Sequence, residues 1–297
     1  MSIAVFGFAE SSGPAGDLAA ALGLPCHQVE TTRFPDGESL VRVCGEADIA
    51  ILYRSLDHPN DRLVELLLAA GALRAGGARK VLLVAPYLGY MRQDMAFRPG
   101  EAISQRIIGA LLADHFDALV TLDPHLHRIA HLSEAVPRIP ALALTAAPLL
   151  AAALERAGEP PVLVGPDAES RPWVEAVAAP GRLDVLVGEK HRHGPRSVEI
   201  TVPGSELVRG RPVVLVDDVI SSGGTLLAAA ERLREAGASG VSALATHCLA
   251  SAHDLARLAS AGIVPVQATQ TVAGPAATIP VAGLLAAGLR EAGWLNG

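Results

Sequence analysis

The sequence has little of what would indicate an extracellular, membrane or nucleic-acid-binding protein. Its three cysteines, Cys26, Cys44 and Cys248, are odd in number and far apart, which argues against a disulfide framework or a cysteine zinc site and favours a reducing, cytoplasmic setting. No window of about 18 uncharged apolar residues occurs, so we expect no membrane span. The N-terminal residues lack the basic segment of a signal peptide. The net charge is −7 and no basic stripe is present, so a nucleic-acid partner is not expected.

What the chain has instead is a large supply of small and aliphatic residues. Half of its 297 residues are hydrophobic but only 3% are aromatic, which suits buried parallel strands and alanine-rich helices. Strand-like and helix-like segments alternate along the chain, and this favours parallel sheets with helices on both faces. The length predicts two tandem, doubly wound α/β domains, residues 1–140 and 141–282, with a C-terminal helix at 283–297 that packs back on the first.

The most informative segment combines a strand, an acidic pair, a small-residue loop and a helix. Residues 213–216 are uniformly aliphatic and predict a short buried strand, which Asp217 and Asp218 follow directly. The loop then consists of Ser221, Ser222, Gly223, Gly224 and Thr225, and a helix pattern begins behind it with Leu226. Adjacent carboxylates at such a place suit sugar hydroxyls or a magnesium ion.

This loop predicts a phosphate cradle. Gly223 and Gly224 allow the backbone to approach an anion closely, and free N–H groups at the helix start point at it. The neighbouring hydroxyl groups add hydrogen-bond donors. The segment matches neither G-x-x-x-x-G-K-[ST] nor G-x-G-x-x-G. An ordinary strand-to-helix turn with capping hydroxyls would explain the loop, but not the two acids directly before it.

Two loops in the first half of the chain also carry polar groups. Asp36 and Glu38 flank Gly37, and taken alone this loop is more simply a solvated turn. The segment 92–94, Arg-Gln-Asp, follows an apolar strand. An arginine there is equally suited to pairing with phosphate oxygens and to a structural salt bridge.

Two further strands end in possible metal ligands. Asp123 and His125 follow the apolar segment 118–122, with His127 and His131 nearby. No acid or cysteine stands at the spacing of a zinc site, so a single histidine beside magnesium is favoured over zinc. Asp167 follows another strand. Because ligands of open parallel sheets bind at the carboxyl ends of strands, we expect these groups to share one site.

Lys190 and Arg192 lie on a segment with alternating charge, followed by Gly194 and Pro195, which is typical of a mobile flap. Cations on a flap are able to close over a polyphosphate and stabilise charge that develops in the transition state. Without its context, the same segment would be a solvated basic turn.

Taken in order, these segments resemble the ribose-phosphate diphosphokinase (phosphoribosyl-pyrophosphate synthetase) family, in its shorter, archaeal-like branch. Each short motif is weak, but five in the right order together with the phosphate loop are strong. The likeness covers nearly the whole chain. It implies two domains of phosphoribosyltransferase type and an enzyme that transfers the diphosphoryl group of Mg-ATP to O1 of ribose 5-phosphate. The products would be phosphoribosyl pyrophosphate and AMP, and the former feeds nucleotide biosynthesis.

The resemblance also implies a role for each matching residue. The ATP contacts would be Phe34, Asp36, Gly37, Glu38, Arg92, Gln93 and Asp94. The magnesium ligands would be Asp123, His125 and Asp167. The catalytic cations would be Lys190 and Arg192. The ribose 5-phosphate site would be formed by Arg192, Asp217, Asp218, Ser221, Ser222, Gly223, Gly224 and Thr225. The resemblance also implies a dimer-based homo-oligomer, a hexamer or tetramer. In the family, the loop that matches the segment around Asp36 contributes to the ATP site across a subunit interface.

The chain departs from the family pattern at His191, where a second flap cation is usual, and at Met95 and Ala96, where many members have basic residues. Two alternatives compete with the synthetase. A phosphoribosyltransferase shares the phosphate loop, but it would be shorter and would lack the two ATP segments. A non-catalytic regulatory homologue would lose a flap cation or a magnesium residue, and this chain retains both kinds.

Overall fold

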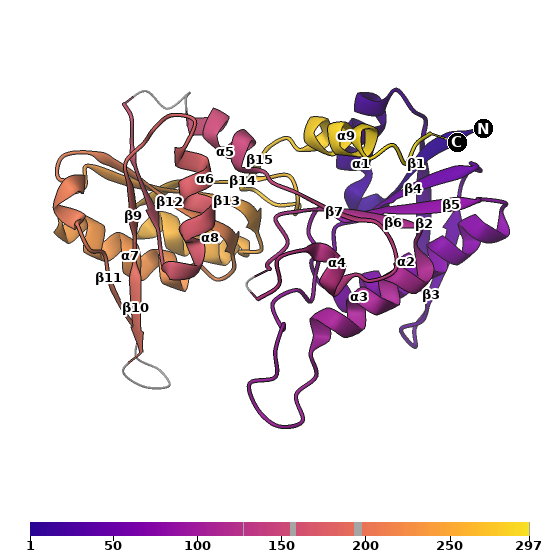
Figure 1. Cartoon of the computed structure of the whole chain (residues 1–297), viewed down its shortest axis with the longest axis horizontal. Helices are drawn as coiled ribbons and strands as arrows, with labels where there is room; N and C mark the ends of the chain where they lie inside the picture. The colour runs from indigo at the N-terminus through magenta and orange to yellow at the C-terminus, as the bar shows by residue number, and fades with distance from the viewer. Residues whose placement is uncertain (127, 155–158, 193–197, 297) are drawn as a thin grey trace. The chain divides into compact units, whose positions relative to one another are not determined.

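The computed structural model describes residues 1–126, 128–154, 159–192 and 198–296. The chain forms two compact units: residues 1–144 with the C-terminal segment from Val281 make the first, and Thr145–Pro280 makes the second. Each unit has its own sheet with flanking helices (Figure 1), so the predicted α/β class is confirmed. Within the described residues, none of the helices combines the length and apolar character needed to cross a membrane.

The sheet of the first unit has seven strands in the order β3-β2-β1-β4-β5-β6-β7. They are β1 Ile3–Phe8, β2 Cys26–Arg33, β3 Ser39–Val43, β4 Ile49–Tyr53, β5 Lys80–Val84, β6 Ala118–Leu122 and β7 Ala141–Leu144. Neighbours pair in parallel except β2 and β3, which are antiparallel. The loop that joins these two strands, residues 34–38, is too short for a crossover and makes a hairpin.

Helices cover both faces of this sheet. They are η1 Ala9–Ser11, α1 Ser12–Leu22, α2 Pro59–Ala75, α3 Ser104–His115, α4 Leu132–Ala135 and α9 Ala282–Glu291. Helices α1 and α9 lie on one face, and α2, α3 and α4 lie on the other (Figure 1). The central strand β4 is therefore buried along its whole length, which explains its uniformly apolar sequence.

The C-terminal helix α9 closes the first unit by packing on α1. The guanidinium of Arg290 donates a hydrogen bond to the carbonyl oxygen of Ala21 at 2.6 Å. A Cβ atom at Gly288 would lie 2.7 Å from Leu144 Cδ1, so glycine at this position permits the close approach of α9 to the end of β7.

The second unit contains a six-stranded, entirely parallel sheet in the order β15-β14-β13-β12-β8-β9. Its strands are β8 Val162–Gly165, β9 Val185–Val187, β12 Pro212–Ile220, β13 Gly240–Cys248, β14 Ile263–Thr269 and β15 Ala277–Ile279. Its helices are α5 Ala147–Leu154, η2 Ala168–Ser170, α6 Arg171–Ala178, η3 Ser205–Val208, α7 Gly224–Glu235 and α8 Ala252–Ser260.

Both faces of this second sheet are packed, as strand β12 illustrates. Val213 and Leu215 belong to one core cluster with residues of α7 and α8, whereas Val214 and Val216 belong to another with residues of α5 and α6. Burial of one such side chain stabilises the fold by roughly 1.5–3 kcal/mol. The two-sided packing explains why the strand is aliphatic at successive positions.

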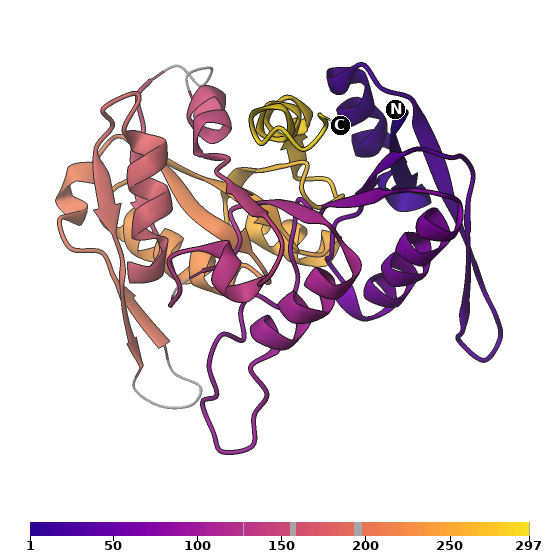
Figure 2. The same cartoon turned by 45° about the vertical axis from the view of Figure 1, so that its right-hand side comes forward.

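A separate antiparallel hairpin projects from the second unit (Figure 2). It consists of β10 Glu189–Arg192 and β11 Val198–Thr201. Residues 193–197, which join these strands and include the predicted Gly194 and Pro195 of the flap, lie outside the described residues.

Candidate active site

The phosphate loop, residues 221–225, connects β12 to α7. The predicted strand 213–216 extends to Ile220, so Asp217 and Asp218 lie within the strand and not behind it. The extension follows from tertiary pairing, because β13 continues the parallel ladder alongside β12 as far as His247 and Cys248. The acidic pair and the entrance of the loop are consequently held on a rigid element.

Helix α7 begins inside the predicted loop, at Gly224. Gly223 is its N-cap, with a φ of 75° that only glycine adopts at little cost. As at other helix starts, the first N–H groups have no acceptor within the helix, and the helix dipole adds to their preference for an anion. Ser221 and Ser222 are exposed and Thr225 is half-buried, so this end of the helix is open to a ligand.

Asp167 joins the acidic pair at the same edge of the sheet. It follows β8, which pairs in parallel with β12. Burial, followed by the charges of Asp218 and Asp167, raises the pKa of Asp217 well above its ordinary value. The N–H of Asp218 also donates a hydrogen bond to Asp217 Oδ1 at 3.0 Å. Negative charge is therefore concentrated beside the phosphate loop, where it fits hydroxyl donors or a divalent cation.

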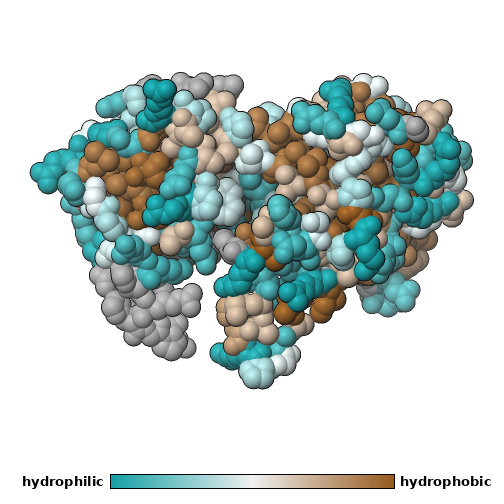
Figure 3. All heavy atoms as spheres, in the orientation of Figure 1, coloured by the Kyte–Doolittle hydropathy of each residue, from teal (hydrophilic) through white to brown (hydrophobic). Residues whose placement is uncertain are grey.

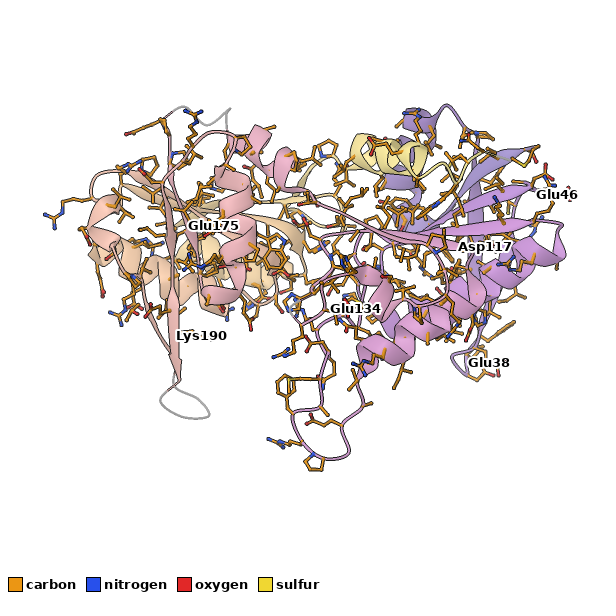
Figure 4. All side chains as sticks on the ribbon, in the orientation of Figure 1. Glu38, Glu46, Asp117, Glu134, Glu175 and Lys190 are labelled. Carbon is orange, nitrogen blue, oxygen red and sulfur yellow. The ribbon has the colours of Figure 1, made fainter. Side chains whose placement is uncertain are left out.

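The β10–β11 hairpin begins next to Asp167. A Cβ atom at Gly188 would lie 2.4 Å from the carbonyl oxygen of Pro166, so glycine lets the base of the hairpin contact the strand end that carries Asp167. Lys190 is exposed on β10 (Figure 4), and Arg192 is the last residue of the same strand. The predicted flap thus has one end anchored beside the acidic cluster.

In the first unit, the predicted ATP loop is the turn between β2 and β3. The N–H of Phe34 donates to the carbonyl oxygen of Glu38 at 2.8 Å, and the N–H of Glu38 donates to Asp36 Oδ1 at 3.2 Å. Gly37 has a φ of 94°. Asp36 thus stabilises its own turn, whereas Phe34 is 44% exposed. Glu38 lies at the far end of the hairpin (Figure 4). An exposed ring on a fixed turn is suited to stacking on a base.

Buried charge fixes this hairpin on α2. Glu65 accepts hydrogen bonds from Ser39 Oγ at 3.0 Å and from Arg54 Nη2 at 2.6 Å. Arg33 Nη2 lies 2.9 Å from Asp61 Oδ2 and 3.6 Å from Glu65 Oε1. Burial acts to raise the pKa of Glu65. The hydrogen bonds from Arg54 and Ser39, together with the charges of Arg54 and Arg33, outweigh burial, and the pKa lies below its ordinary value. Sequence analysis did not select Glu65, although a carboxylate among the buried leucines of a helix is a signal that the position is partnered.

Arg92, Gln93 and Asp94 lie on the long loop between β5 and α3. Arg92 is exposed, and the Gln93 side-chain amide donates to the Met95 carbonyl oxygen at 3.1 Å. Asp94 is buried and accepts hydrogen bonds from Arg128 Nη1 at 2.6 and 2.8 Å. Among these three residues Arg92 is therefore the one most accessible to a ligand, and Asp94 stabilises the conformation of the loop. Their contacts with ATP stay predictions.

Two residues that sequence analysis missed hold the same loop. Gln105, 1% exposed in the first turn of α3, donates from Nε2 to the Met91 carbonyl oxygen at 3.2 Å. The guanidinium carbon of Arg128 lies 5.8 Å from the centre of the Phe97 ring. The projecting part of the loop bears apolar surface (Figure 3), and Phe97 is 63% exposed there. A buried amide in an apolar helix was a usable signal for Gln105, but nothing local marks Arg128.

Asp123 and His125 follow β6, as predicted from the pattern. Asp123 is buried with a φ of 32°, and its N–H donates to the Leu144 carbonyl oxygen at 2.9 Å. Non-glycine residues in this conformation are uncommon and cluster at functional sites. His125 is half-buried, and His131 is the N-cap of α4. His127 lies outside the described residues.

The predicted metal ligands divide between the two units: Asp123 and His125 belong to the first and Asp167 to the second. No group of three or more histidine, cysteine or acidic side chains that could hold a metal ion occurs in the part of the chain that the structure describes. Magnesium commonly needs only one or two carboxylates, with water and substrate phosphate completing its coordination. Oxygen donors beside a phosphate loop fit that mode of binding, and the assignment of the three ligands stays a prediction.

A largely parallel seven-stranded sheet and an entirely parallel six-stranded sheet, with an acidic pair near the end of strand β12 and a phosphate loop directly behind that strand, define an α/β protein of phosphoribosyltransferase type. The chain matches the model of the N-terminal domain of ribose phosphate pyrophosphokinase over residues 3–115. It matches the model of the phosphoribosyl transferase domain over residues 133–273. The chain belongs to the ribose-phosphate pyrophosphokinase family.

Individual relatives agree with this assignment. The chain is 37% identical over 269 residues to the ribose-phosphate pyrophosphokinase of Methanopyrus kandleri, covering 89% of this chain and 91% of that protein. It is 34% identical over 285 residues to that of Methanothermobacter thermautotrophicus, covering 95% and 98%. The crystal structure of phosphoribosylpyrophosphate synthetase from Mycobacterium smegmatis matches over the full length of both chains with a TM-score of 0.84 and 28% identity. The resemblance to the family, including its archaeal branch, is confirmed.

Proposed function

We propose that the protein is a ribose-phosphate pyrophosphokinase, which makes phosphoribosyl pyrophosphate and AMP from ATP and ribose 5-phosphate. The anomeric O1 attacks the β-phosphorus of ATP, and its proton is released to water. The O1–Pβ bond forms, the bond from Pβ to the oxygen that bridges it to the α-phosphorus breaks, and AMP leaves. The observation that carries the proposal is the close association, within the second unit, of the phosphate loop, three carboxylates and the base of a cationic hairpin.

Each element has a distinct task in this reaction. The loop 221–225 would hold the 5-phosphate through N–H and hydroxyl donors, and Asp217 and Asp218 would accept hydrogen bonds from the ribose hydroxyls. Lys190 and Arg192 would stabilise negative charge on the transferring diphosphoryl group. Because phosphoryl transfer needs little covalent participation by the protein, positioning and charge neutralisation carry most of the catalysis.

On the ATP side, the exposed ring of Phe34 would stack on the base, and Arg92 would pair with phosphate oxygens. Asp36, Gly37 and Glu38 would shape the loop that presents the ring. Gln93 and Asp94 would maintain the conformation that brings Arg92 to the nucleotide.

Magnesium is the cofactor that these residues suit. By the family resemblance, Asp167 of the second unit and Asp123 and His125 of the first would be magnesium ligands, and the bound ion would neutralise charge on the phosphates of ATP. Burial is the first cause of the raised pKa of Asp217, and the charges of Asp218 and Asp167 add to it; a divalent cation would offset the part that these neighbouring charges cause. A cytoplasmic location and a dimer-based homo-oligomer stay predictions from the sequence.

The test is incubation of the purified protein with Mg-ATP and ribose 5-phosphate, with AMP and phosphoribosyl pyrophosphate quantified separately by ion-exchange chromatography. Equal amounts of both products are expected. Activity with another nucleoside triphosphate in place of ATP would reassign the donor and direct attention to Met95 and Ala96. Binding of ribose 5-phosphate without turnover by any donor would favour the non-catalytic homologue. Consumption of phosphoribosyl pyrophosphate with a base would favour the transferase.

A further inference from the structure

The backbone of the phosphate loop is held by a side chain from outside the loop. Arg257, on α8, donates a hydrogen bond from Nη2 to the carbonyl oxygen of Ser222. Asp254 Oδ1 lies 3.4 Å from the same guanidinium nitrogen. Asp254 is itself fixed at the start of α8, where Ser251 Oγ donates to its carboxylate at 2.6 Å. Asp254 therefore helps to orient the Arg257 guanidinium group toward the loop.

Helix α8 also supports the loop sterically. A Cβ atom at Gly223 would lie 2.9 Å from Leu258 Cδ2, so this part of the loop rests directly on the helix. Gly223 has a φ of 75°, which glycine adopts at little cost, and its lack of a side chain permits this contact. The loop thus rests on α8 at Gly223, while its neighbours Ser222 and Gly224 are exposed.

Because the peptide bond is planar, the hydrogen bond from Arg257 to the Ser222 carbonyl oxygen also fixes the direction of the Gly223 N–H. The peptide between Ser222 and Gly223 is trans, so its carbonyl oxygen and its N–H point in opposite directions. When Arg257 draws the carbonyl oxygen of Ser222 toward α8, the N–H of Gly223 must face away from α8. An inverted peptide would instead present a carbonyl oxygen to the ligand, and a carbonyl oxygen repels phosphate.

We propose that Arg257 is a positioning residue for the sugar phosphate: it sets the orientation of the Ser222–Gly223 peptide so that the Gly223 N–H donates to the 5-phosphate. The inference rests on the proposed function of residues 221–225 as the ribose 5-phosphate site. Arg257 acts through the backbone, because its hydrogen bond is made to a carbonyl oxygen of the loop and not to the substrate.

The experiment compares the wild type with Arg257→Met, Arg257→Lys and a matched control, Arg232→Met. Arg232 also lies on an exposed helix face, with 44% of its side chain exposed against 45% for Arg257, and it pairs with Glu235 three residues on. For each protein, the KM of ribose 5-phosphate, the KM of ATP, kcat and the melting temperature are measured. Calorimetric titration with ribose 5-phosphate alone measures binding independently of turnover.

We expect Arg257→Met to weaken ribose 5-phosphate binding roughly 10- to 100-fold, the loss of about one hydrogen bond to a charged group. The KM of ATP should change less than about twofold, and the melting temperature should match that of Arg232→Met within a few degrees. Arg257→Lys retains a cationic donor and should recover most of the binding. A merely structural role would lower the melting temperature and affect both substrates alike.

Binding of ribose 5-phosphate by Arg257→Met at the wild-type affinity would overturn the inference and leave the proposed function intact. Equal increases in both KM values together with a lower melting temperature would overturn it as well. Weaker ribose 5-phosphate binding by Arg257→Met in a protein without turnover would support the inference while contradicting the proposed enzyme. Failure of the wild type to bind ribose 5-phosphate would contradict both.

Discussion

Arg128 Nη1 lies 2.6 Å from Asp94 Oδ1 and joins the segment after β6 to the loop between β5 and α3. The Asp94 side chain is only 2% exposed, whereas that of Arg128 is 47% exposed. A carboxylate as buried as this depends on its partner, because it has little access to water. The pair therefore controls the conformation of the loop that presents Arg92.

We expect Arg128→Met to lower the free energy of unfolding by about 1–3 kcal/mol, because it leaves the Asp94 carboxylate buried without its donor. Urea denaturation measures the change. The matched control is Arg138→Met, which breaks an ion pair whose partners are both more than half exposed. Such a pair contributes about 0–1 kcal/mol. Equal effects of the two substitutions would contradict a specific role for Arg128.

Lys190→Ala should lower kcat by roughly 100- to 1,000-fold, the usual effect of removing one preorganised group that stabilises transition-state charge. The KM of ATP should change much less, because the interaction strengthens as charge develops in the transition state. Steady-state kinetics measures both. The control is Lys80→Ala, because Lys80 is the only other lysine of the chain and is also exposed. A comparable loss of ATP binding and of rate would argue that Lys190 binds the ground state.

Asp217→Asn should weaken ribose 5-phosphate binding without lowering the thermal stability of the ligand-free protein. Burial and the charges of Asp218 and Asp167 disfavour the ionised form of Asp217 in the folded protein, and a neutral amide at this position does not incur that cost. Calorimetry with and without ribose 5-phosphate measures both effects. Asp184→Asn, which affects an exposed carboxylate paired with Arg211, is the control. A marked fall in melting temperature for Asp217→Asn would indicate that Asp217 supports the fold.

Glu65 should make the stability of the first unit depend on pH. Its pKa is lowered in the folded protein, so its contribution is complete above the ordinary glutamate pKa and is lost as the pH falls through the folded value. Glu65→Gln should therefore destabilise the protein by about 1–3 kcal/mol at pH 7, and the difference should shrink between about pH 5 and pH 3. Urea denaturation across this range measures it. Asp61→Asn, at a 66% exposed partner of Arg33, should show little of this dependence.

Part of the fold could be predicted from the sequence, because the local pattern of apolar residues determines which segments form buried strands. Strands such as β4 and β5 are apolar runs, and their burial on both faces requires this composition. Strand β2 has no such apolar pattern, because only Val29 of its residues is buried and the remainder are largely polar. It is a strand because it pairs with β1 on one side and forms a hairpin with β3 on the other.

Some features of the candidate site could likewise be predicted from the sequence, whereas others became evident only in the structure. The sequence by itself determined the phosphate loop and the acidic pair, because these motifs are contiguous and their chemistry depends on neighbouring residues. It determined the family through the order of several separate motifs along the chain. The sequence also predicted that Asp167, at a strand end, shares a site with the acidic pair, but only the tertiary structure identified Asp217 as the carboxylate whose pKa it affects and extended β12 to Ile220. Only the tertiary structure placed Arg257 against the carbonyl oxygen of Ser222. These relationships depend on strand register and helix packing between segments distant in the chain, and no local spacing of residues encodes them.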